Sequence, residues 1–151
     1  VEEMRRKAKR TGRQVLLTYI DLDGLKRVND ERGHSEGDRL LVATADVLRA
    51  AFRQQDVVAR LGGDEFVAMA LLGRRHDEQL DCRAIEMRLE QAVRAKHEEL
   101  GDLYDFSVSF GSTVANHVQL AQIDDLLARA DQQMYKAKRA RRRKRAPAKE
   151  S

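Results

Sequence analysis

The sequence is poor in residues that mark several classes of protein. It has one cysteine, Cys82, so it cannot form an internal disulfide, and nothing indicates an oxidising compartment. It has one proline, no tryptophan and 5% aromatic residues. No apolar run approaches the roughly 20 residues of a membrane span, and no signal-peptide pattern is present. Collagen-like, disulfide-rich and wholly disordered classes are excluded. We expect a cytoplasmic domain, whose parent protein could be anchored in a membrane upstream.

Charged residues, by contrast, make up 36% of the 151 residues, against about 25% in an average protein. The length predicts one domain, which we place at residues 1–142. Residues 143–151 are expected to form a disordered basic tail. Residues 138–151 hold eight Lys and Arg and one acid, whereas residues 1–137 hold 21 Lys and Arg and 24 Asp and Glu. Such a basic end could bind nucleic acid or an anionic membrane. We favour a solvated helix end and expect no nucleic-acid partner.

Hydrophobic patterning predicts an α+β fold. Helices are expected over 1–13, 25–33, 40–52, 77–100 and 123–137, and strands over 15–20, 57–61, 66–72 and 106–115. This order indicates a split βαβ, ferredoxin-like sheet that contains antiparallel strands and is flanked by helices. A β-hairpin carries the turn at residues 62–65. In this arrangement the first strand, buried on both faces, runs antiparallel beside the second hairpin strand, so Asp21 should lie next to Asp64.

Four acidic residues are therefore expected at one edge of the sheet: Asp21, Asp23, Asp64 and Glu65. Carboxylates this close raise one another's pKa unless a cation neutralises them. Hard oxygen ligands in this number suit Mg²⁺ together with substrate phosphates and water. Gly62 and Gly63 let the backbone turn sharply or let a large ligand approach. Either loop alone is more simply a strand end or a hairpin turn, but their meeting favours a metal–phosphate site.

The segment 24–38, GLKRVNDERGHSEGD, follows the first strand. It offers Lys26 and Arg27 to phosphates and Asn29 and Asp38 to the edge of a base. Taken alone, such a segment is usually solvated, and a lone histidine such as His34 more often packs or caps a helix than acts as a catalyst.

Four stretches in order resemble the GGDEF family of bacterial diguanylate cyclases: DLDGLKRVNDERGHSEGD, RLGGDEF, FSVSFGSTVA and ADQQMYKAKRARR. The likeness runs from about residue 15 to residue 142. It implies a fold similar to the polymerase palm and the class III nucleotide cyclases. It also implies second-messenger signalling, in which an enzyme condenses two GTP into cyclic di-GMP and releases two pyrophosphates. Expected partners are Mg²⁺ or Mn²⁺, a second subunit in a homodimer that brings two GTP face to face, and an upstream sensor domain.

The resemblance assigns roles to single residues. Asp21 and Asp64, with the backbone carbonyl of Leu22, match the metal ligands, and Asp64 or Glu65 would assist deprotonation of the 3′-hydroxyl. The remaining matched positions bind substrate: Asn29 and Asp38 match the residues that bind the guanine edge, and Lys26, Lys138 and Arg142 match phosphate-binding positions. His34 matches a histidine that either lies near the ribose or is structural, and Gly62 and Gly63 form the turn beside the substrate. In-line displacement at phosphorus needs charge neutralisation and alignment more than covalent chemistry, which agrees with this set.

Arg53-Gln54-Gln55-Asp56 is an RxxD sequence that ends five residues before GGDEF. In the family this position is the inhibitory site, where the product binds. An arginine can form a forked pair with a phosphate or guanine, and an aspartate can accept from guanine N–H groups. An RxxD sequence by itself can also be an ordinary helix end.

The sequence departs from the family pattern in three places. The usual opening stretch is missing, so we expect an N-terminal truncation within the first helix. Arg141 stands where glycine is common, and Gly24 and Leu25 stand where bulkier aromatics often sit. The first aspartate and both acids of GGDEF are all present. Their presence favours an active enzyme over a silent module that binds GTP or cyclic di-GMP.

Overall fold

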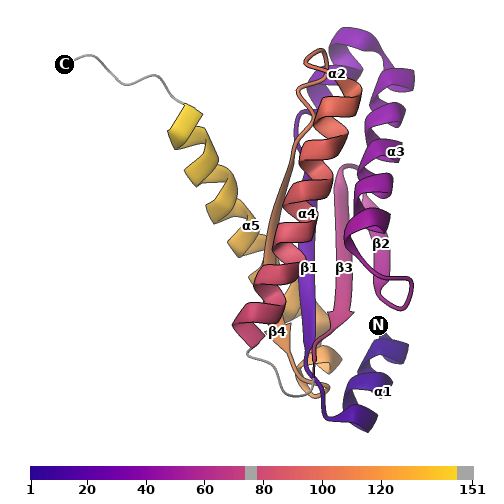
Figure 1. The fold of residues 1–151 in the computed structure, drawn as a ribbon, viewed down its shortest axis with the longest axis vertical. Helices are drawn as coiled ribbons and strands as arrows, with labels where there is room; N and C mark the ends of the chain where they lie inside the picture. The colour runs from indigo at the N-terminus through magenta and orange to yellow at the C-terminus, as the bar shows by residue number, and fades with distance from the viewer. Residues whose placement is uncertain (74–77, 146–151) are drawn as a thin grey trace, which may run out of the picture.

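The computed structural model describes residues 1–73 and 78–145, and within these ranges a four-stranded sheet forms the centre of the fold (Figure 1). The strands are β1 (Val15–Leu22), β2 (Val57–Gly62), β3 (Glu65–Leu71) and β4 (Val108–Ala115). Their order is β2-β3-β1-β4, and every pairing is antiparallel. The hairpin thus lies on one side of β1 and the last strand on the other. The predicted α+β fold of the split βαβ type is confirmed.

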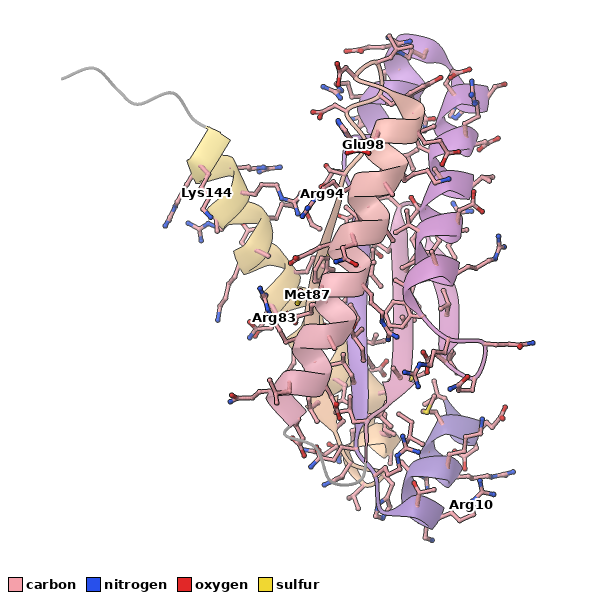
Figure 2. All side chains as sticks on the ribbon, viewed as in Figure 1. Arg10, Arg83, Met87, Arg94, Glu98 and Lys144 are labelled. Carbon is pink, nitrogen blue, oxygen red and sulfur yellow. The ribbon has the colours of Figure 1, made fainter. Side chains whose placement is uncertain are left out.

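Helices cover both faces of this sheet. They are α1 (Glu2–Thr11), α2 (Leu25–Arg32), α3 (His34–Ala51), α4 (Glu78–Leu100), the short 3₁₀ helix η1 (Gln119–Gln122) and α5 (Ile123–Arg145). Figure 2 labels three charged side chains of α4, those of Arg83, Arg94 and Glu98, and all three are exposed. Within the described ranges, none of the helices has the length and apolar character to cross a bilayer.

The core consists of two apolar clusters, one on each face of the sheet. Leu16 and Ile20 of β1 pack with α2, α3 and α4, whereas Leu17 packs with α1 and α5. Successive side chains of a strand point to opposite faces, so a strand covered on both faces is apolar throughout. This explains why all eight residues of β1 are buried, as the uninterrupted run predicted.

Some predicted boundaries were wrong. Helix α3 begins at His34 and not at residue 40, because its first turns are polar and carry little apolar periodicity. Its N-terminus follows α2 directly at Gly33. Strand β4 begins at Val108, two residues later than predicted. The helical periodicity of residues 123–137 predicts Leu127 and Ala137 on the inner face of the last helix, but Leu126 is buried there, Leu127 is half-buried and Ala137 is exposed.

The end of the chain also differs from the prediction. Residues 143–145, which we expected in a disordered tail, belong to α5. Basic residues at a helix C-terminus interact favourably with the helix dipole, which is a physical reason for this extension. The rest of that tail, 146–151, and the predicted first residue of α4, Asp77, lie outside the described residues.

Helix α5 makes its closest approach to the sheet at Gly111 of β4. A Cβ placed at Gly111 would lie 2.6 Å from the carbonyl oxygen of Ala130, and closer still to the backbone nitrogen of Met134. The backbone of α5 therefore rests on a position where no side chain fits. Because Lys138 follows Met134 by one helical turn, this contact determines where Lys138 meets the edge of the sheet.

Candidate active site

The end of β1 and the turn of the β2–β3 hairpin meet at one edge of the sheet. Asp21 lies opposite Glu65 in the strand register, and the amide of Leu22 donates to the carbonyl oxygen of Asp64 at 2.9 Å. The two loops are thus joined through their backbones, as the topology predicted. The turn itself is held by Arg60, whose guanidinium donates to the carbonyl oxygen of Gly63 at 2.7 and 3.0 Å. Gly63 has a φ of 48°, in the left-handed region that favours glycine.

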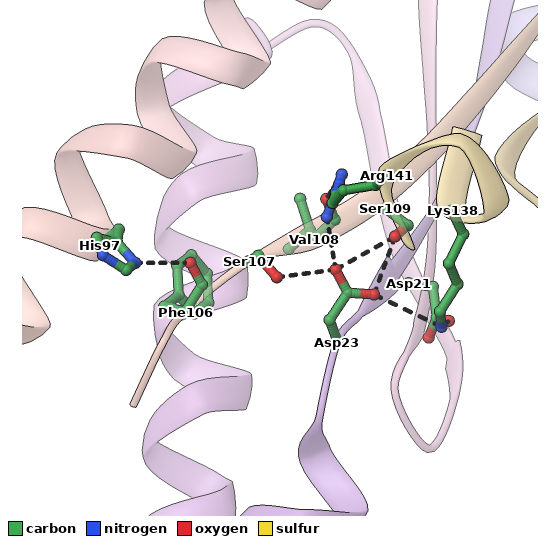
Figure 3. A network of polar contacts seen from close by, with 9 residues as sticks. All are labelled: Asp21, Asp23, His97, Phe106, Ser107, Val108, Ser109, Lys138 and Arg141. Carbon is green, nitrogen blue, oxygen red and sulfur yellow. Dashed lines mark hydrogen bonds and ion pairs between the residues drawn. The ribbon is translucent and has the colours of Figure 1, made fainter. Parts of the chain in front are cut away.

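Asp21 is a buried carboxylate with one oxygen engaged and one orphaned. The ammonium of Lys138 donates to its Oδ2 at 2.9 Å, whereas its Oδ1 is buried and has no hydrogen-bond partner (Figure 3). Burial raises the pKa of Asp21 to about 6, and the nearby charge of Asp64 adds to burial while Lys138 opposes it. A buried carboxylate in this state is stabilised by any further cation that reaches Oδ1.

Lys138 forms ion pairs with both acidic residues at the end of β1, Asp21 and Asp23. Its ammonium also lies 3.5 Å from Oδ1 of Asp23. Burial by itself lowers the pKa of Lys138, but the hydrogen bond and charge of Asp21, together with Asp23, outweigh burial and raise it. Lys138 therefore stays charged and places a positive group among the acids, where phosphate oxygens would also be attracted.

Both carboxylate oxygens of Asp23 accept hydrogen bonds from neighbouring side chains. Ser107 Oγ and Ser109 Oγ donate to it at 2.9 Å, and Arg141 Nη1 donates at 2.8 Å (Figure 3). Arg141 also donates through Nη2 to the carbonyl oxygen of Val108 at 2.8 Å. Asp23 thus ties β1 to β4 and α5. The two carboxylates of the β1 exit thus differ, because Asp23 is fully engaged whereas Asp21 keeps one buried oxygen, Oδ1, without a partner.

Glu65 extends from the turn towards Tyr19, two residues before Asp21 on β1. Burial raises the pKa of the Tyr19 phenol, and the adjacent Glu65 carboxylate raises it further. The phenol therefore remains protonated beside Glu65. Glu65 itself is exposed, where a substrate hydroxyl can reach it.

The residues expected to hold the nucleotide lie on α2, α3 and α5. Asn29 of α2 packs against α3 at Gly37, the residue that precedes Asp38. Asp38 is exposed and lines a hollow of about 300 Å³ between α3 and α4. Lys26, His34 and Arg142 are exposed. None of the hydrogen bonds or ion pairs among the described residues joins these three to the acidic group.

A metal ion at this edge would be held by few protein ligands. Over the described ranges, no three His, Cys, Asp or Glu side chains are grouped so as to hold a metal ion by themselves. Mg²⁺, however, is typically bound by one or two carboxylates, and phosphates and waters complete its shell. Asp21, with its orphaned Oδ1, and the adjacent Asp64 would supply these two carboxylates. The residues present fit a magnesium ion that is shared with a phosphate substrate.

The RxxD sequence forms a tight turn beside a second cavity. The amide of Arg53 donates to Oδ2 of Asp56 at 2.7 Å, and the amide of Asp56 donates to the carbonyl oxygen of Arg53 at 2.9 Å. The cavity, of about 460 Å³, is also lined by Arg13 and Arg88. Nε of Arg88 is buried without a hydrogen-bond partner. Arg13, Arg53 and Arg88, which come from three parts of the chain, therefore line one cavity.

Sequence similarity to known proteins identifies the family. Residues 1–144 match the family described as "Diguanylate cyclase, GGDEF domain". The chain belongs to the GGDEF family. This GGDEF chain is 32% identical over 134 residues to the diguanylate cyclase DgcP of Escherichia coli (strain K12), which covers 87% of the chain and 38% of that relative. The chain thus spans about two fifths of the length of that relative.

Solved structures of GGDEF proteins share the fold. A sensory box/GGDEF family protein from Caulobacter crescentus CB15 superposes with a TM-score of 0.73 and 28% identity, covering 91% of this chain and 86% of that one. A microbial GGDEF domain whose interaction with cyclic di-GMP has been described superposes with a TM-score of 0.67 and 29% identity, covering 91% and 81%.

Sequence reasoning missed several residues of the site in this GGDEF domain. Arg141 was noticed only as a departure from glycine, and its pairing with Asp23 was not foreseen. The spacing of Ser107 and Ser109 in FSVSF places both hydroxyls on one face of the chain, which is the signal that could have identified them. Arg88 gave no such signal, because it lies in a helix where charged residues are frequent.

Proposed function

We propose that this GGDEF domain is a diguanylate cyclase, which condenses two GTP into cyclic di-GMP and releases two pyrophosphates. The observation that carries the proposal is the meeting of Asp21, Asp64 and Lys138, with one buried oxygen of Asp21 left unpartnered. The name of the E. coli relative supports the same activity. The upstream sensor domain and the cytoplasmic location stay predictions.

Asp21, Asp64 and the backbone carbonyl of Leu22 would hold Mg²⁺ or Mn²⁺. When bound, the ion neutralises phosphate charge and favours ionisation of the attacking hydroxyl. The protein's part is to keep two carboxylates together at the sheet edge, through the strand register and the Leu22–Asp64 backbone hydrogen bond.

The remaining groups bind and orient the two reactants. Lys138, already placed beside Asp21, interacts with phosphate oxygens, and the exposed Lys26 and Arg142 add positive charge around them. Asn29 and Asp38 bind the guanine edge. Interactions of this kind hold the 3′-oxygen in line with the phosphorus, which is the main requirement of phosphoryl transfer.

The chemical step is an in-line displacement that occurs twice. The 3′-oxygen of one GTP forms a bond to the α-phosphorus of the other, and the bond from that phosphorus to pyrophosphate breaks. The hydroxyl proton passes to Asp64 or to the exposed Glu65 at the turn. The second displacement closes the ring, so two pyrophosphates leave for each cyclic di-GMP.

A second copy of the chain completes the reaction. One chain carries a single DLDG and a single GGDEF sequence, yet the product contains two guanosines. A two-fold pair presents two equivalent half-sites to each other, which suits a reaction that is itself symmetric. We therefore infer that a homodimer is the active form.

The RxxD turn is proposed as the site of product inhibition. Arg53 and Asp56 border a cavity of about 460 Å³ that Arg88 also lines. Arginines suit both the phosphates and the guanine faces of cyclic di-GMP. A related GGDEF domain has been described in its interaction with cyclic di-GMP, which supports binding of this ligand by a domain of this fold.

Incubation with GTP and Mg²⁺, followed by chromatography, tests the activity. We expect cyclic di-GMP and two equivalents of pyrophosphate from the unaltered chain. The Asp64→Asn variant should fold normally and form no product, because it removes a charge from a turn and empties no core. The matched control is Asp30→Asn, at an exposed position of α2. Near-full activity of Asp64→Asn would contradict the proposed carboxylate pair.

A further inference from the structure

Helix α2 packs against the bare backbone of α3 at Gly37. Gly37 is buried in the first turns of α3. A Cβ placed there would overlap Oδ1 of Asn29 and would lie 2.8 Å from its Cγ and 3.2 Å from Cδ1 of Leu25. The carboxamide of Asn29 therefore occupies the space that any side chain at residue 37 would need.

Tyr104, in the segment before β4, contacts both α2 and α3 near the point where the two helices meet. The hydroxyl of Tyr104 donates to Glu36, the residue before Gly37, and Nη1 of Arg39 donates to that hydroxyl at 3.3 Å. The guanidinium groups of Arg32, at the end of α2, and Arg39 lie 5.7 and 5.8 Å from the centre of the Tyr104 ring. These contacts hold both helices to the segment before β4. A group added at residue 37 would thus displace the short side chain of Asn29 before it displaced the helices.

We propose that Gly37 determines nucleotide specificity as a positioning residue: its missing side chain lets the Asn29 carboxamide lie against α3 and fixes the hydrogen-bonding edge that selects guanine. This inference rests on the proposed function, in which Asn29 binds guanine. Guanine differs from hypoxanthine by an exocyclic amino group, which needs a fixed acceptor. A displaced carboxamide would no longer present its oxygen to that amino group in the same position, and the acceptors at the guanine edge would be reduced to Asp38.

The Gly37→Ala variant distinguishes a role in guanine selection from a role in stability, because the two roles predict different changes in melting temperature and in nucleotide preference. Glycine within a helix is destabilising relative to alanine, and the atom that must yield is the end of a flexible side chain. The melting temperature of Gly37→Ala should therefore be at or above that of the unaltered chain. Its preference for guanine should nevertheless fall.

The test is the binding of GDP and IDP by calorimetry, which needs no turnover. We expect the unaltered chain to bind GDP about tenfold more tightly than IDP, and Gly37→Ala to lose most of this preference. Asn29→Ala should lose the preference to a similar extent. In the Asn29→Ala background the Gly37→Ala change should have little further effect, because the overlap is gone. Ala50→Ser, an exposed change on α3, is the control.

Two outcomes would overturn the inference. One is a Gly37→Ala protein that keeps the full preference for GDP. The other is a Gly37→Ala change that alters the preference for GDP over IDP as much in the Asn29→Ala background as in the unaltered chain. If Gly37→Ala fails to fold, recovery of folding in the double variant supports the overlap, and failure of the double variant refutes it. A chain that prefers GDP but forms no cyclic di-GMP would refute only the proposed function.

Discussion

Replacement of Asp21 by asparagine should stabilise the metal-free domain at neutral pH. The Asp21 side chain is 12% exposed, and its pKa is raised from 3.8 to about 6, mainly by burial. One pKa unit corresponds to about 1.4 kcal/mol, so the ionised carboxylate opposes folding by about 3 kcal/mol. Active sites commonly sacrifice stability in this way.

The pH dependence gives the sign of this effect. Because the folded state holds the proton more tightly than the unfolded state, protonation of Asp21 favours folding. The destabilisation is absent below the unfolded pKa of 3.8, grows as the pH rises towards 6, and is complete above it. The stability difference between Asp21→Asn and the unaltered chain should therefore rise from near zero at low pH to about 3 kcal/mol at pH 7.

Urea unfolding with EDTA, over a pH series, measures this difference. Asp30→Asn, on the exposed face of α2, is the control and should change the free energy of unfolding by less than about 0.5 kcal/mol. With Mg²⁺ added, the unaltered chain should gain stability, and Asp21→Asn should gain much less. If Asp21→Asn is less stable than the unaltered chain at pH 7 without metal, the ion pair with Lys138 outweighs burial and the reasoning fails.

Three other predictions follow from the packing and the proposed reaction. Arg53→Ala should reduce inhibition by added cyclic di-GMP without raising the initial rate, and equal inhibition in progress curves of both proteins would remove the inhibitory role. Gly111→Ala should lower the free energy of unfolding by about 1–3 kcal/mol, because the added Cβ meets the backbone of α5; urea midpoints at or above those of the unaltered chain would contradict this. Specific activity should rise with enzyme concentration over a hundredfold dilution series and rise further in a leucine-zipper fusion, whereas a flat response from a monomer would exclude the half-site mechanism.

Much of the architecture follows from local patterns in the sequence. The apolar run of β1 predicted a central strand, and the two runs around Gly62-Gly63 predicted the hairpin, because pairing and turn formation depend on nearby residues. Antiparallel pairing of β1 with β3 then placed Asp21 beside Asp64. The start of α3 was not predictable in the same way, since its polar first turns contribute no apolar periodicity.

Only the tertiary structure decided which partners complete the site. Lys138 reaches Asp21 across 117 positions of sequence, and Arg141 reaches Asp23 across 118. Both contacts depend on the close approach of α5 to Gly111, which is a matter of side-chain volume and helix placement. The contact between the Asn29 carboxamide and Gly37 likewise depends on how α2 packs against α3. Local sequence patterns specify which elements form and which way they face, whereas distances of a few ångströms between elements are decided by how the whole core packs.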